Sequence, residues 1–107
     1  MTWPRDLVDA GHPEFLEHAE RWLLDRSPPE WRTSTLRGDV AALAWAVAHH
    51  MEGARAGARQ AYREARTRFQ EPLLTRVHTA LESYGAHLLT VEREVAQVRR
   101  ALDRRST

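Results

Sequence analysis

The sequence predicts an all-α protein in which a short N-terminal helix precedes a long antiparallel helical hairpin, with two copies assembled as a homodimeric helical bundle. Three observations support this prediction. Apolar residues recur at helical spacing, prolines stand where helices would start and stop, and there is more apolar surface than one chain can cover. The composition, 42% hydrophobic and 29% charged, is typical of one helical domain over residues 1–107, with an irregular arm at 1–12.

The first helix is expected at about residues 13–26. Pro13 suits the first helical position because its missing N–H would have no partner there, and Glu14 is favourable at the positive end of the helix dipole. The dipeptide Pro28-Pro29 then ends the helix, since each proline restricts the residue before it. The predicted buried face consists of Phe15, Leu16, Ala19, Trp22 and Leu23.

The second helix is expected at about residues 39–69, with Asp39 as its N-cap because a carboxylate can accept a hydrogen bond from the free N–H groups of the first turn. Its first half, 40–48, is apolar on every side and therefore needs more than one neighbour. Its middle is rich in small residues. Gly53 and Gly57 each cost about 1 kcal/mol relative to Ala, which suggests that something packs tightly there.

The third helix is expected at about residues 72–104 and carries the clearest pattern in the chain, a seven-residue repeat typical of a coiled-coil seam. The seam residues are Leu74, Val77, Leu81, Tyr84, Leu88, Val91, Val95, Val98 and Leu102. Pro72 breaks the helical pattern before the seam and predicts a tight antiparallel turn. The alternative is one kinked helix of about 65 residues, whose seam only a second chain could cover.

A homodimer is expected because the hairpin is longer than its cover. Helices of about 30 residues are about 45 Å long, and the first helix can cover less than half of that length. Two hairpins would then form a four-helix bundle. The expected interface residues are Trp22, Trp31, Val40, Leu43, Trp45, Val47, Leu81, Leu88 and Val95. The tryptophans would wedge the first helix and the Pro-Pro turn against the second helix around Trp45, or form an interaction hot spot.

Six histidines make a metal site one interpretation of the sequence. In an antiparallel hairpin, His87 would lie opposite the group His49, His50 and Glu52. Zinc and iron sites need three or four convergent ligands, and the chain has neither the Glu-x-x-His pairs of di-iron bundles nor a His-Glu-x-x-His motif. We therefore expect no metal and no cofactor, and interpret these imidazoles as side chains at the edge of the core, with His50 partly buried.

A row of arginines is expected on one face of the second helix. Its members are Arg55, Arg59, Arg63 and Arg66. Arginine binds phosphate well, so the row could contact nucleic acid. However, the net charge is only +1, no recognition helix follows a turn, and no aromatic residues alternate with the arginines. A solvated charged face, with Glu82 of the third helix near Arg59, is the simpler interpretation.

No catalytic signature is present, since the chain has neither a glycine-rich phosphate loop nor a G-x-S-x-G motif. The absence of Cys excludes disulfides, thiolate metal sites and cysteine nucleophiles. No stretch is apolar enough for a membrane span. Lys, Asn and Ile, whose codons are AT-rich, are all absent, which indicates a GC-rich genome and most simply a bacterium.

These observations together predict a small, non-enzymatic, cytoplasmic bacterial protein that self-associates and acts through protein–protein interaction, as an adaptor or regulator. Its protein partner cannot be named from the sequence. A nucleic-acid-associated regulator that uses the arginine row is the second hypothesis. A helical bundle that binds a metal or a small ligand is the third.

Overall fold

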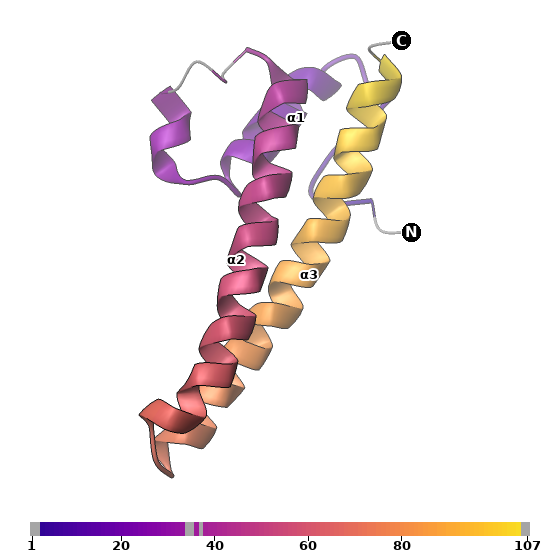
Figure 1. The fold of residues 1–107 in the computed structure, drawn as a ribbon. Coiled ribbons are helices and arrows are strands. Elements are labelled where there is room, and N and C mark those ends of the chain that lie inside the picture. The colour runs from indigo at the N-terminus through magenta and orange to yellow at the C-terminus, as the bar shows by residue number, and fades with distance from the viewer. Residues whose placement is uncertain (1–2, 34–35, 37, 106–107) are drawn as a thin grey trace.

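The computed structural model describes residues 3–33, 36 and 38–105, of which 77% lie in helices and none in a strand. The helices are α1 (Phe15–Leu24), the 3-10 helix η1 (Pro29–Thr33), α2 (Val40–Arg68) and α3 (Leu73–Arg105). α2 and α3 pack along each other as an antiparallel hairpin, with α1 and η1 at one end (Figure 1). The all-α hairpin prediction is confirmed, and the alternative of one continuous kinked helix is wrong.

Local chemistry explains where the long helices begin and end. Asp39 caps α2, because one of its carboxylate oxygens accepts a hydrogen bond from the Ala42 N–H at 3.1 Å. The turn after Arg68 contains a cis Glu71–Pro72 peptide bond. The Glu71 carboxylate accepts hydrogen bonds from the hydroxyl and the backbone N–H of Thr75, and these bonds lower the pKa of Glu71 below its ordinary value.

α1 is shorter than expected, at Phe15–Leu24 rather than about 13–26. The residues before it form a turn in which the Phe15 N–H donates to the carbonyl of His12 at 3.0 Å. The N-terminal arm folds onto α1, as shown by the Trp3 ring, which lies 6.0 Å from the ring of Phe15. Leu7 of the arm is buried in the same hydrophobic cluster as residues of α1, α2 and α3.

The hairpin has two regions. The body comprises the described residues outside 55–87. In it, the N-terminal arm, α1 and η1 form a core together with one end of the hairpin. The fully buried large side chains of this core are Pro4, Phe15, Leu23, Leu43, Val47, Val95 and Val98. In the distal arm, residues 55–87, the two helices project beyond the body without a third element beside them (Figure 1). Ala58 and Ala65 are the only buried residues of the distal arm.

Two expectations for α2 are wrong, because α1 and η1 contact only one of its sides. Trp45 is 54% exposed and packs on the ring of His49 rather than at the centre of a tryptophan cluster. His50 is exposed, although its ring lies 5.8 Å from that of Trp31. A Cβ atom added to Gly53 or Gly57 would meet nothing within 4 Å, so no described part of the same chain packs closely against these glycines, and close packing by a second chain stays a prediction.

Candidate functional site

One line of seam residues loses its cover where the body ends. The line runs along α3 at steps of seven residues: Val77, Tyr84, Val91 and Val98. Val91 and Val98 are 6% and 0% exposed in the body, whereas Tyr84 is 49% exposed on the distal arm. The other seam line, which includes Leu81 and Leu88, stays at least partly buried along its whole length. On the distal arm, α2 therefore still covers the seam line that includes Leu81. The line that includes Tyr84, which the body covers at Val91 and Val98, has no cover from the body there.

α2 changes in the same way on the same side of the hairpin. Val47 is buried in the body, Ala54 is half-buried, and Ala61, at the next step of seven, is exposed. Gly57 is also exposed and lies seven residues after His50, which faces η1. We call this surface the uncovered strip. It consists of the exposed residues Leu73, Ala80 and Tyr84 and the half-buried Val77 on α3, with the exposed Gly57 and Ala61 on α2.

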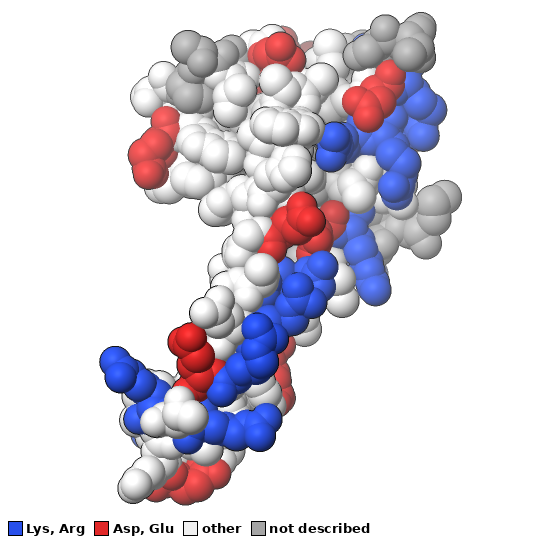
Figure 2. All heavy atoms as spheres, viewed as in Figure 1, with Lys and Arg blue, Asp and Glu red and all other residues white. Residues whose placement is uncertain are grey.

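The arginine row lies along the distal arm, and its four members have different environments. Arg55 is held by Glu92, with 2.6 Å between Nε and Oε2. The other three, Arg59, Arg63 and Arg66, are exposed and form no ion pair with any described residue. Figure 2 shows basic side chains along the arm on the face turned to the viewer, with acidic side chains where the arm joins the body.

A hollow of about 210 Å³ lies between α2 and α3 beside this row. It is lined by Arg55, Ala58, Arg59, Tyr62, Leu81, Glu82 and Gly85. The expected proximity of Glu82 to Arg59 is thus confirmed. The Tyr62 hydroxyl donates a hydrogen bond to Glu82 at 2.8 Å, which raises the pKa of Tyr62, and the Tyr62 ring stacks on His78 at 4.0 Å. These contacts hold the wall of the hollow in place.

The candidate metal ligands only partly come together. The Nδ1 atom of His49 lies 3.8 Å from a carboxylate oxygen of Glu52 on the same helix. His50 faces Trp31, and His87 is exposed on α3. Within the described ranges, no three His, Asp or Glu side chains converge on a point where a metal ion could bind.

The expected interface residues have unequal access to a partner. Leu43, Val47 and Val95 are fully buried, and Trp22 and Leu88 are nearly so, all within the core of their own chain. The half-buried members are Val40, Trp31 and Leu81, and Trp45 has the most exposed side chain of the set. Their participation in an interface stays a prediction. The sequence pattern did not indicate Leu73, Ala80, Tyr62 or Gly85 as site residues. Leu73 and Ala80 lie beside the seam rather than in it, and Tyr62 and Gly85 line one hollow only once α2 and α3 are paired.

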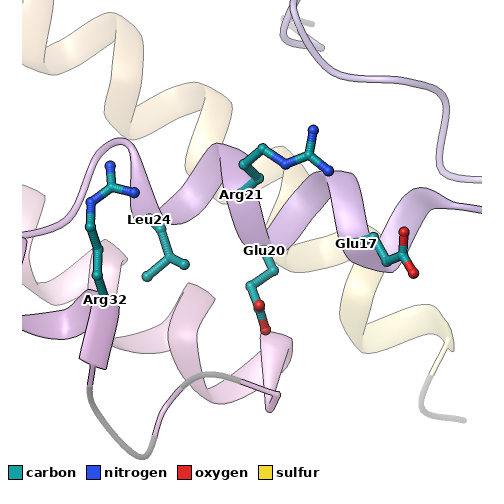
Figure 3. Close-up of a pocket in the computed structure, with 5 residues that line it drawn as sticks. All are labelled: Glu17, Glu20, Arg21, Leu24 and Arg32. Atoms are coloured by element: carbon teal, nitrogen blue, oxygen red, sulfur yellow. The ribbon is translucent and has the colours of Figure 1, made fainter.

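Another hollow, of about 340 Å³, lies beside α1 and η1 and has charged walls (Figure 3). It is lined by Glu17, Glu20, Arg21, Leu24 and Arg32. Two of these side chains are engaged with neighbouring segments. The Glu20 carboxylate accepts a hydrogen bond from the Gly38 N–H at 2.7 Å, and Arg32 pairs with Asp25 at 3.0 Å. These contacts tie the segment after η1 to α1 and η1 itself to the C-cap residue of α1, which is a structural role.

No helix in the described part of the chain combines the length and apolarity needed to cross a bilayer. Comparison of the chain with protein-family models, curated proteins and solved structures found no match.

Proposed function

We propose that the protein is a non-enzymatic adaptor or regulator that acts through protein–protein interaction and forms a homodimer through the uncovered strip. The observation that supports this proposal is the change along one line of α3, from fully buried Val98 to half-exposed Tyr84. A heptad repeat that continues past its own cover presents apolar side chains spaced to pack against another helix. The absence of Lys, Asn and Ile supports a bacterial source, and a cytoplasmic location stays a prediction.

The strip has the self-complementary shape that a two-fold dimer requires. Its large side chains, Leu73, Val77 and Tyr84, are all on α3, whereas α2 contributes only the small residues Gly57 and Ala61. In a face-to-face dimer, α3 of one copy would lie against α2 of the other, with Tyr84 above the glycine. This arrangement gives a reason for an exposed helical glycine, which costs about 1 kcal/mol when nothing approaches its backbone.

The size of the strip indicates a reversible dimer. The distal arm of each copy is about 22 Å long, because each of its helices has about 15 residues at about 1.5 Å per residue. Its two helices side by side are about 20 Å wide. Face-to-face contact would then bury roughly 900 Å² in total, which is below the range of standard stable interfaces. We therefore expect a dissociation constant on the order of 10 μM.

Light scattering over a dilution series tests this proposal. The chain should be dimeric at about 500 μM and monomeric at about 1 μM, given the expected dissociation constant. Tyr84→Glu places a charge in the centre of the strip and should give a monomer throughout. The control is Leu16→Glu, at a 45% exposed position on α1 outside the strip, which should still dimerise. A monomeric wild type at the highest concentration, or equal effects of the two variants, would contradict the proposal.

A further inference from the structure

We infer that the opposite face of the distal arm binds an acidic amphipathic helix of another protein, whose carboxylates pair with Arg59, Arg63 and Arg66 and whose apolar side chain enters the hollow between Ala58 and Gly85. The inference goes beyond self-association, because it concerns a different face and a different partner.

The two faces are separated by the interface between α2 and α3. Ala58 is buried there, and consecutive residues of an α-helix are 100° apart around the axis. Gly57 and Arg59 therefore lie on opposite sides of Ala58. Gly57 belongs to the uncovered strip, whereas Arg59 lines the hollow. A partner helix on the arginine side would leave the uncovered strip free.

The charge distribution favours an acidic partner. Residues 40–107 contain eleven arginines and seven acidic residues, whereas residues 1–39 contain five arginines and eight acidic residues. The small net charge thus conceals a basic hairpin beside an acidic N-terminal part. On the distal arm, Arg59, Arg63 and Arg66 are exposed and form no ion pair with described residues, so a partner's carboxylates would not have to displace existing ones.

The hollow supplies the apolar part of the site. Two small residues, Ala58 and Gly85, face the space, and a Cβ atom on Gly85 would meet nothing within 4 Å. The ring of Tyr62 forms one wall and is held by its hydrogen bond to Glu82 and by its stacking on His78. A preformed hollow reduces the conformational entropy lost when a partner's leucine or phenylalanine enters it.

The geometry favours a helix over a nucleic acid. A groove between two helices that pack side by side accepts a third helix, with anchors spaced by three or four residues. Glu92 already pairs with Arg55 at the body end of the row, and Glu82 lines the hollow. The positive charge is therefore confined to Arg59, Arg63 and Arg66 instead of continuing along the whole row as a phosphate backbone would require. The aromatic residue within the row, Tyr62, already stacks on His78, whereas single-stranded nucleic acids bind to successive aromatic rings with free faces.

Fluorescence anisotropy with labelled probes tests the inference on the full chain. The first probe is a helical peptide of about 20 residues with Leu at heptad core positions and Glu elsewhere. The second replaces each Leu with Ala, the third replaces each Glu with Lys, and the fourth is a duplex DNA. We expect saturable binding of the first probe, weakened about tenfold or more by either peptide change. Equal binding of the first two peptides, tighter binding of DNA, or no saturation at about 500 μM peptide would overturn the inference.

Two variants test the two halves of the site. Gly85→Leu fills the hollow and replaces a helical glycine with a better helix former, so the fold is retained while peptide affinity falls about tenfold. The combination Arg59→Glu, Arg63→Glu and Arg66→Glu should abolish binding. The matched controls are Gly53→Leu and Arg93→Glu, at exposed positions that line neither the hollow nor the strip, and both should bind like the wild type.

Light scattering on the same variants separates this inference from the proposed dimer. Gly85→Leu should dimerise normally, and Tyr84→Glu should still bind the acidic peptide. Unchanged peptide affinity in Gly85→Leu would overturn the placement of the site, whatever the oligomeric state.

Discussion

The body and the distal arm consist of the same two helices, but only the body has a third layer. α1 has 10 residues and α2 has 29, so α1 is about 15 Å long and the hairpin helices exceed 40 Å. Where α1 and the N-terminal arm lie against the hairpin, large side chains such as Leu43 and Val95 are fully buried. Where they end, only Ala58 and Ala65 remain buried.

The comparison shows that one heptad pattern can serve two purposes. In the body it closes a core within the chain, and in the distal arm it leaves apolar surface that another chain can cover. The residues that accompany the pattern differ as well. The body contains buried aromatic and branched side chains, whereas the distal arm combines alanines and glycines with the exposed arginines Arg59, Arg63 and Arg66. The distal arm is therefore the region where we place both proposed interactions.

The largest expected difference concerns stability. Leu43→Ala removes a fully buried side chain from the body and should lower the free energy of unfolding by about 3 kcal/mol. Leu81→Ala removes a half-buried side chain from the distal arm and should cost only about 1 kcal/mol, because part of that side chain already contacts water. Urea unfolding at low protein concentration measures both values. Equal losses would show that the arm is as well packed as the body.

Hydrogen exchange should separate the two regions next. Amides of α3 in the distal arm should exchange at least about tenfold faster than those near Val95, because a two-helix arm can open without disrupting the core. Protection in the arm should rise with protein concentration if the uncovered strip mediates dimerisation, while protection near Val95 stays constant. If the exchange protection of the distal arm does not change with protein concentration, the uncovered strip is not the dimer interface.

The two open glycines of α2 form a matched pair. Gly53→Ala and Gly57→Ala should each raise the stability of the monomer by about 0.5–1 kcal/mol, because no atom lies within 4 Å of the added Cβ. Only Gly57→Ala should weaken the dimer, since only Gly57 lies in the uncovered strip. Thermal unfolding of dilute protein and light scattering of concentrated protein test the two effects. Identical behaviour of both variants in light scattering would remove Gly57 from the interface.

The smallest expected effect depends on pH and concerns the body. The hydrogen bond from the indole N–H of Trp22, with a further contribution from Arg26, lowers the pKa of Asp6 below 3.8. A lowered pKa in the folded state contributes stability above the ordinary pKa, and this contribution disappears as the pH falls below 3.8 through the lowered value. Asp6→Asn should therefore reduce the loss in the free energy of unfolding as the pH falls from about 5 to about 2, measured by urea unfolding. An equal loss in the variant and the wild type would contradict the assignment.

The predicted limits of the long helices lie within one residue of those observed for α2 and α3, because short-range chemistry sets them. Asp39 caps its own helix, and Pro72 cannot continue the helix before it. The site was harder to predict. The seam and the arginine row were evident from their spacing, but Tyr62 and Gly85 gained significance only when α2 and α3 were paired in register, which places them in one hollow.

The sequence by itself determined that the chain is helical, where its long helices begin and end, and in which direction each apolar residue points around its helix. Only the tertiary structure decided which of those residues are covered. Heptad spacing is the same at Tyr84 as at Val98, and the two differ in exposure because α1 and the N-terminal arm lie beside one and not the other. Side-chain periodicity reports an angle around a helix axis, whereas burial also depends on how far along that axis a neighbour extends.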